Sequence, residues 1–204
     1  MWDKILVLDQ QALLSLNWHG SDFVDWLFWF ISQRWIWLPL YLLVMYMIYR
    51  RVGFKRLLAF IGFSVVAIVC IDLICNFFKE FVPKFRPTHN PQILSMVYTS
   101  FGYRGGFYGT VSAHSAIAFF IASFTARIIH KPVFSWILYL WATAVAYSRI
   151  YLGVHFPMDI LFGFTLGSLC GICSFKIFVS QKFINWISRR NNYKQNVLEV
   201  NNQN

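Results

Sequence analysis

The chain has 204 residues, of which 58% are hydrophobic, 20% are aromatic and only 13% are charged. Soluble domains usually carry about 25% charged residues, so this composition excludes an ordinary soluble domain and indicates a membrane protein. The net charge of +10 does not indicate nucleic-acid binding, because the Lys and Arg residues lie in short segments beside apolar runs and form no single basic stripe.

The first long apolar stretch, residues 23–49, is interrupted by Gln33 and Arg34 and then by Pro39. We therefore expect a short interfacial or partly inserted helix over residues 22–32 and a membrane-crossing helix over 35–49. Residues 1–11 lack the basic stretch and apolar core of a signal peptide, so we expect no cleavage, and the first span should direct insertion.

Further apolar runs cover residues 57–78, 115–129, 133–147 and 160–179, each close to the roughly 20 residues that cross a bilayer. The sequence therefore predicts an all-α fold, a polytopic transmembrane bundle of five spans, or six if the short helix also crosses. Residues 1–188 should form a single domain, and the polar, Asn-rich residues 189–204 a disordered cytoplasmic tail.

The segment 80–112 contains three prolines and four glycines and predicts a long loop. Loops of this length in compact proteins are usually functional. Basic residues cluster at 50–56, 127–131 and 176–194, and these clusters alternate with segment 79–112 and the link at 149–158. Cytoplasmic loops are enriched in Lys and Arg, so the clusters should be cytoplasmic and the other two segments should face outward.

Three short motifs with side chains that could take part in a reaction lie at the outer ends of successive spans. In chain order they are Lys79 with Arg86 and Pro87, then Ser112, Ala113 and His114, then Ser148, Arg149, His155 and Asp159. Three of these residues are cations in the outer segments, against the orientation bias. Lys79, Arg86 and Arg149 could bind a phosphate group and stabilise its transition state, although each alone could simply extend to the lipid headgroups.

His155 and Asp159 are four residues apart at the start of a predicted helix, so they share one face. The carboxylate can bind one imidazole nitrogen and leave the other free to attack phosphorus. Pro157 fits the first helical turn, where its missing N–H has no partner. The alternative is a purely structural His–Asp pair. Ser112 could cap the following span, where a helix N-terminus favours an anion.

These motifs resemble those of the type 2 phosphatidic acid phosphatases, which are Lys-x6-Arg-Pro, Pro-Ser-Gly-His and Ser-Arg-x5-His-x3-Asp. The first and third match at every defining position; in the second, Val111 replaces the proline and Ala113 the glycine. The resemblance covers about residues 57–180. It implies that His155 is the nucleophile and that His114 donates a proton to the leaving group and later activates water.

Asp72 lies inside an apolar run, where a carboxylate costs about 2.5–3.5 kcal/mol. Asp72, Asn76 and Lys79 share a helix face, so we expect Asp72 to face the bundle and either bond across helices or orient Lys79. Ser148 is expected to support the site. The His and acidic residues are not spaced as a ligand set, so no metal or other cofactor is expected.

The expected function is hydrolysis of a phosphomonoester or terminal diphosphate of a lipid. We expect a bacterial inner-membrane location with an outward-facing site, no nucleic-acid partner and no obligate protein partner. Isoprenoid diphosphates, phosphatidylglycerol phosphate, phosphatidic acid and lipid A phosphates all fit. A phosphotransferase using the same histidine is an alternative. A lipid transporter is a weaker one, because repeated halves are not evident.

Overall fold

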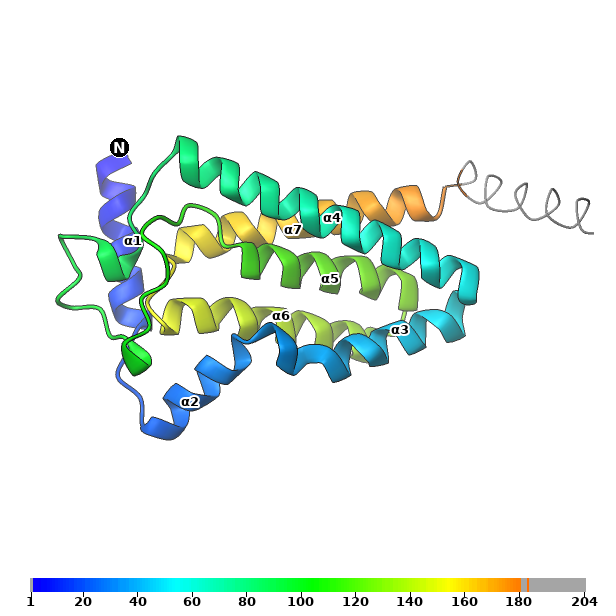
Figure 1. Ribbon diagram of the computed structural model, residues 1–204, viewed down its shortest axis with the longest axis horizontal. Helices are drawn as coiled ribbons and strands as arrows, with labels where there is room; N and C mark the ends of the chain where they lie inside the picture. Colours follow the sequence, from blue (N-terminus) through cyan, green and yellow to red (C-terminus); the bar gives the residue numbers. More distant parts are fainter. Residues whose placement is uncertain (1, 181–182, 184–204) are drawn as a thin grey trace, which may run out of the picture.

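The computed structural model describes residues 2–180 and residue 183, which form helices joined by loops (Figure 1). The elements are α1 (Trp2–Leu16), α2 (Asp22–Ile31), η1 (Arg34–Trp37), α3 (Leu38–Val52), α4 (Phe54–Phe81), η2 (Pro87–His89), η3 (Ser100–Gly102), α5 (Ala113–Ile129), α6 (Pro132–Tyr151) and α7 (Pro157–Phe178). Within the described part the one β-pairing is an isolated bridge between Phe85 and Tyr108. The all-α prediction is confirmed, whereas the predicted tail at 189–204 lies outside the described residues.

Three helices, α4, α6 and α7, are long and apolar enough to cross a membrane. Helix α2 passes the same test together with η1 and α3, but the two parts are bent by 68°. The apolar α5 has only 17 residues and α3 only 15, which is short of the roughly 20 that a span requires. The structure thus gives three or four candidate spans, and the number five or six stays a prediction.

Helix α5 forms the centre of the bundle, between α6 and α7 and covered by α3 and α4 (Figure 1). Thirteen of its 17 residues are buried. The 28-residue α4 buries only Phe60, Ile71 and Cys75 and therefore leaves a wide apolar face outward. That exposed apolar face suits contact with lipid.

A stripe of glycines on α7 allows α5 and α7 to approach closely. Gly163, Gly167 and Gly171 recur every fourth residue, so they share one face of the helix. A β-carbon at Gly167 would lie 2.0 Å from the carbonyl oxygen of Ala116, and one at Gly163 would lie 2.7 Å from that of Ser112. Small residues at such crossings let two membrane helices pack backbone to backbone.

We expect Gly167→Ala to destabilise the protein by about 1–3 kcal/mol, because the added methyl group must separate α5 from α7. The measurement is thermal unfolding of the purified protein in detergent. Gly62→Ala on α4 is the matched control, since a β-carbon there has no atom within 4 Å. A lower midpoint for Gly62→Ala than for Gly167→Ala would contradict this account of the packing.

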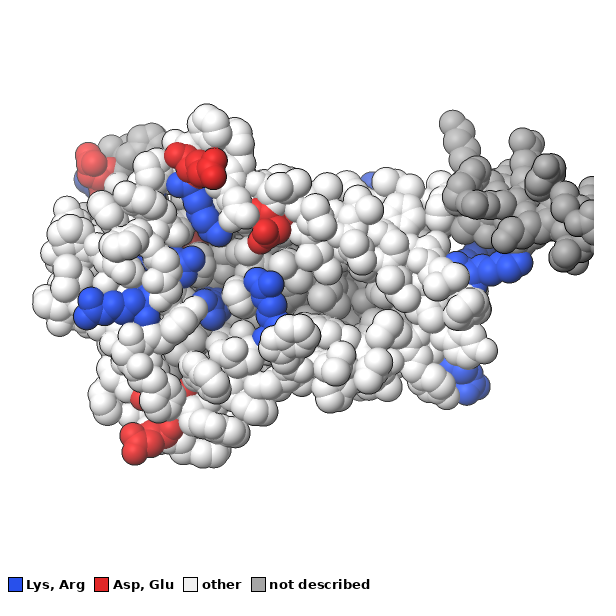
Figure 2. Space-filling view, in the orientation of Figure 1, with Lys and Arg blue, Asp and Glu red and all other residues white. Residues whose placement is uncertain are grey.

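Two ends of the bundle differ in composition. The α3–α4 turn, the α5–α6 turn and the end of α7 lie at one end, and they carry the described members of the three basic clusters (Figure 1). Loop 82–112, the α6–α7 turn and α1 lie at the other end. On the face shown in Figure 2, most of the charged side chains lie in the half of the molecule that carries loop 82–112, and fewer lie at the opposite end. The described members of the clusters therefore lie at one end of the bundle, as predicted, and which end is cytoplasmic stays a prediction.

Helix α1, which the sequence did not indicate, lies across the end of the bundle that carries loop 82–112 (Figure 1). The buried side chain of Asn17 donates to the carbonyl oxygens of Ile150 and Tyr151 at 3.2 and 2.7 Å and accepts from the N–H of Tyr98 at 2.7 Å. Asp25 of α2 accepts hydrogen bonds from the hydroxyls of Tyr98 and Tyr151. These bonds fasten α1, α2 and the loop onto α6.

Candidate active site

His155 lies in the turn between α6 and α7 and is only 3% exposed. Its Nδ1 is 3.3 Å from Oδ2 of Asp159, and the same oxygen accepts the N–H of Phe156 at 3.0 Å. Pro157 occupies the first turn of α7, as predicted. The carboxylate thus closes the start of the helix and holds the ring by one nitrogen. The other nitrogen, Nε2, is left for chemistry.

Burial lowers the pKa of His155 to about 4. The carboxylate of Asp159 acts in the opposite direction, whereas the positive charges of Arg86 and Arg149 add to the lowering. The imidazole is therefore neutral near pH 7, which is the form that can act as a nucleophile.

Lys84 and Asp9 extend this arrangement, and sequence reasoning did not assign either of them to the site. Nζ of Lys84 is 2.9 Å from Oδ1 of Asp159 and 2.9 Å from Oδ2 of Asp9. Asp9 also accepts the N–H of Met158 at 2.9 Å. Lys84 thus neutralises two buried carboxylates and ties α1 to the start of α7. The signal in the sequence was that Lys84, like Arg86 and Arg104, is a cation in the outer loop against the orientation bias.

We expect Lys84→Met to lower kcat about 10- to 100-fold with little change in KM. Without Lys84 the buried carboxylate of Asp159 loses its ion pair, and it can then move away from Nδ1 of His155. Lys84→Arg should recover part of the rate. The measurement is steady-state phosphate release. Lys55→Met, at the opposite end of the bundle, is the control, and equal losses in both variants would contradict a positioning role for Lys84.

Arg86 and Arg149 lie beside His155. A β-carbon at Gly109 would lie 3.2 Å from both Nε of Arg86 and Cε1 of His155, so these two side chains both adjoin Gly109. Nε of Arg86 donates to the carbonyl oxygen of Tyr108 at 3.0 Å. Burial, and then the positive charge of Arg149, lowers the pKa of Arg86.

Arg149 is 4% exposed, and its Nε has no hydrogen-bond partner among the described residues. Its guanidinium carbon lies 5.9 Å from the ring centre of Tyr103. Burying an N–H donor without an acceptor costs free energy. An anionic ligand could supply the acceptor that Nε of Arg149 lacks.

Ser112 caps α5, where its hydroxyl accepts the N–H of Ser115 at 3.4 Å. The N–H of Ser112 donates to the carbonyl oxygen of Asp159 at 3.1 Å, which brings the second motif against the third. Ala113 does not have a positive φ, so the alanine fits without backbone strain. His114 follows in the first turn of α5 and interacts electrostatically with His155.

The hydrogen bonds of the remaining predicted residues are made to groups other than His155. Lys79 donates to Asn76 at 2.9 Å, and Asn76 donates to Asp72 at 3.2 Å. Asp72 is exposed, so the expectation that it faces the bundle is wrong. It lies on the outward face of the long helix α4. It contacts Lys79 only through Asn76. The hydroxyl of Ser148 donates to the carbonyl oxygen of Val145 at 2.6 Å and so bonds within α6.

No group of three or more His, Cys, Asp or Glu side chains that could hold a metal ion occurs among the residues described here. The residues around His155 instead supply cationic donors.

The model of the PAP2 superfamily matches residues 57–183. The chain belongs to the PAP2 superfamily. The resemblance inferred from the three motifs is thereby confirmed. All three motifs lie within the matched range.

Three similar proteins illustrate the family. The lipid A 4'-phosphatase of Porphyromonas gingivalis is 33% identical over 87% of this chain and 75% of its own length. The undecaprenyl-diphosphatase of Sulfolobus acidocaldarius is 28% identical over 72% of this chain and 65% of its own length. The crystal structure of Aquifex aeolicus LpxE superposes with a TM-score of 0.62 at 25% identity and covers 81% of this chain and 93% of that one.

Proposed function

We propose that this chain is a membrane lipid phosphatase that hydrolyses a phosphomonoester or a terminal diphosphate bond of a lipid through a phosphohistidine intermediate on His155. The observation that carries the proposal is the buried pair of His155 and Asp159, whose Nδ1 and Oδ2 are 3.3 Å apart, together with the unpaired Nε of the buried Arg149 at the end of α6. A neutral nucleophile and an anion-binding donor stand together there. No metal ion is required, because cations supply the charge stabilisation.

The proposed reaction has two steps. Nε2 of His155 attacks phosphorus while the bond from phosphorus to the leaving oxygen breaks, and His114, which starts this step as the imidazolium, donates a proton to that oxygen. A water molecule then gives a proton to His114 and attacks the phosphorus, which breaks the P–N bond and releases inorganic phosphate. Both histidines return to their starting state.

Cations and amide donors would hold the phosphate through both steps. Arg86 and Arg149 are the principal ligands in this proposal, with Lys79 reaching in from the end of α4. The N–H groups of Ala113 and His114, at the N-terminus of α5 behind the Ser112 cap, suit the equatorial oxygens. The site would face outward from a bacterial inner membrane, with the lipid tails left in the bilayer.

The test is phosphate release from a panel of lipid phosphates and lipid diphosphates by the purified protein in nanodiscs, with and without a strong chelator. We expect release that the chelator does not change, and an acid-labile phosphoenzyme after rapid quench with labelled substrate. Loss of activity with the chelator would contradict the metal-free mechanism, and steady turnover with no labelled protein would contradict the phosphohistidine.

A phosphotransferase is the second candidate, since the same intermediate could pass its phosphate to a lipid hydroxyl. Adding an acceptor lipid to the same assay distinguishes the two reactions. A hydrolase releases as much inorganic phosphate as the product lipid it forms. A transferase instead forms a phosphorylated acceptor and depends on the acceptor for turnover.

A further inference from the structure

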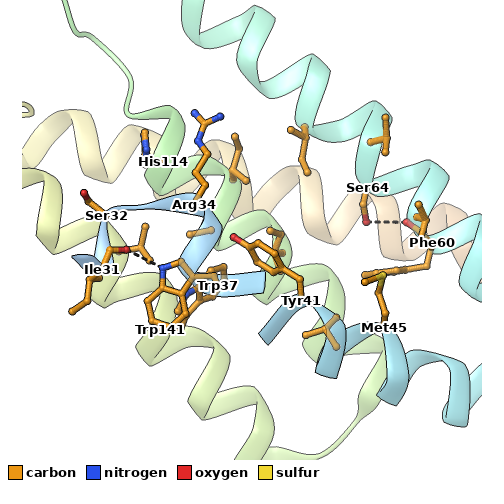
Figure 3. A pocket seen from close by; sticks show the side chains of 18 residues that line it. Ile31, Ser32, Arg34, Trp37, Tyr41, Met45, Phe60, Ser64, His114 and Trp141 are labelled. Atoms are coloured by element: carbon orange, nitrogen blue, oxygen red, sulfur yellow. Dashed lines mark hydrogen bonds between the residues drawn. The ribbon is translucent and has the colours of Figure 1, made fainter. Parts of the chain in front are cut away.

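An apolar groove runs from the candidate active site along the bundle. It lies between η1 and α3 on one side and α4, α5 and α6 on the other, with a volume of about 350 Å³. This is at the lower end of the range of small-molecule sites, roughly 300–1,000 Å³. Figure 3 shows His114, Ser32 and Arg34 at one end and Met45, Phe60 and Ser64 toward the other.

Arg34 is the one Lys or Arg side chain that lines this groove. The bend between α2 and α3 places it there, and the indole N–H of Trp37 closes that bend by donating to the carbonyl oxygen of Ile31 at 2.9 Å. No carboxylate pairs with Arg34 among the described residues. Its charge acts instead on His114 and Arg149.

The groove lies on the leaving-group side of the proposed reaction. In phosphoryl transfer the attacking and leaving atoms are roughly in line across phosphorus. His155 attacks from the α6–α7 turn, and His114, which is the proton donor to the leaving oxygen in the proposed function, lines the groove. The departing lipid therefore moves past His114 toward Arg34.

A leaving alcohol needs a proton, which His114 can supply, but no additional cation. A leaving group that is itself a phosphate carries negative charge beside the broken bond, and a guanidinium stabilises such charge strongly. An unpaired arginine beside the proton donor thus fits the second of these leaving groups.

Building on the proposed function, we propose that Arg34 binds the leaving group of a lipid diphosphate and that the groove behind it receives one hydrocarbon chain of that lipid. Arg34 would then determine the preference for diphosphate over monophosphate. The far end of the groove, near Ser64, would limit the length of the chain.

The first test compares a prenyl diphosphate with the prenyl monophosphate of the same chain. We expect Arg34→Gln to lower kcat/KM about 10- to 100-fold for the diphosphate and less than about threefold for the monophosphate. Arg34→Lys should retain part of the preference, and it replaces Arg34→Gln if that variant does not fold. Arg51→Gln, at the other end of α3, is the control and should change neither rate.

Equal losses on the two substrates, or no loss on either, would overturn the assignment of Arg34 to the leaving group. The wild type in the same assay separates this result from a failure of the proposed function. Phosphate release by the wild type with an unchanged substrate ratio in Arg34→Gln overturns the inference alone. No release by the wild type from any lipid overturns both.

The second test fills the groove. Ser64 donates its hydroxyl to the carbonyl oxygen of Phe60 at 2.8 Å, and Thr143, exposed on α6, makes the same kind of bond to Tyr139 at 2.9 Å. We expect Ser64→Trp to lower kcat/KM about tenfold for a long-chain diphosphate and to spare a short-chain one. Thr143→Trp should spare both. Unchanged turnover of the long-chain substrate by folded Ser64→Trp would overturn the groove as a chain site.

Discussion

Replacing His155 with Ala is expected to abolish turnover, with kcat/KM falling about 10⁴-fold or more, since the proposed covalent intermediate forms on this imidazole. The loss should be the same for every lipid in a substrate panel, because each substrate would use the same nucleophile. Phosphate release by the purified variant in nanodiscs measures it. The labelled phosphoenzyme should disappear in the same variant.

The matched control is His89→Ala, because His89 lies in loop 82–112 at the same end of the bundle but outside the three motifs. It should retain activity within about threefold. A His155→Ala variant that is folded and still forms the labelled phosphoenzyme would assign the nucleophile to another residue.

The pH dependence of the wild type follows from the lowered pKa of His155. Its folded pKa, about 4, lies below the usual 6.5, so the neutral nucleophile persists as the pH falls through 6.5. After correction for ionisation of the substrate, the His155-dependent loss of kcat/KM should appear only as the pH approaches about 4. A fall in kcat/KM near pH 6.5 that is caused by protonation of His155 would contradict the lowered pKa of this buried imidazole.

Replacing His114 with Gln should lower kcat about 10²- to 10⁴-fold for a lipid phosphomonoester, because an alkoxide leaving group needs a proton in the transition state. An aryl phosphate, whose phenolate leaves without a proton, should lose much less in the first step. The expected signature is a burst of phenolate followed by slow turnover, because the same residue is needed to activate water.

Rapid-quench kinetics on the aryl phosphate measure this, and the phosphoenzyme should accumulate in His114→Gln. Ser115→Ala is a suitable comparison on the same turn of α5, since the hydroxyl of Ser115 bonds to the carbonyl oxygen of Ile160 at 3.1 Å and has no proposed chemical role. Equal losses for lipid and aryl substrates with no burst would remove the proton-transfer role from His114.

Local spacing made parts of the site predictable. His155 and Asp159 are separated by one helical turn, and Pro157 and Ser112 have clear preferences for the first positions of a helix. The structure places each of these where the spacing predicted. Arg86 and Arg149 also lie at the same end of the bundle, as their places beyond the ends of apolar runs predicted.

Contacts between distant parts of the chain were not predictable in this way. Lys84 and Asp159 are 75 residues apart, and Asp9 and Met158 are 149 apart, so no periodicity joins them. The exposure of Asp72 was misjudged for the same reason: an apolar run does not reveal which of its faces meets the bundle. Arg34 looked like an interruption of a span until the bend at η1 turned it toward His114.

The amino-acid sequence by itself determined that this protein is an all-helical membrane protein, and it predicted which histidine, carboxylate and arginines carry the chemistry, because composition and helical spacing are properties of short segments. Only the tertiary structure decided how those segments meet. The close approach of α5 and α7 along three glycines, the placing of α1 over the site and the position of Arg34 in the groove all depend on packing between helices, which the local sequence does not encode.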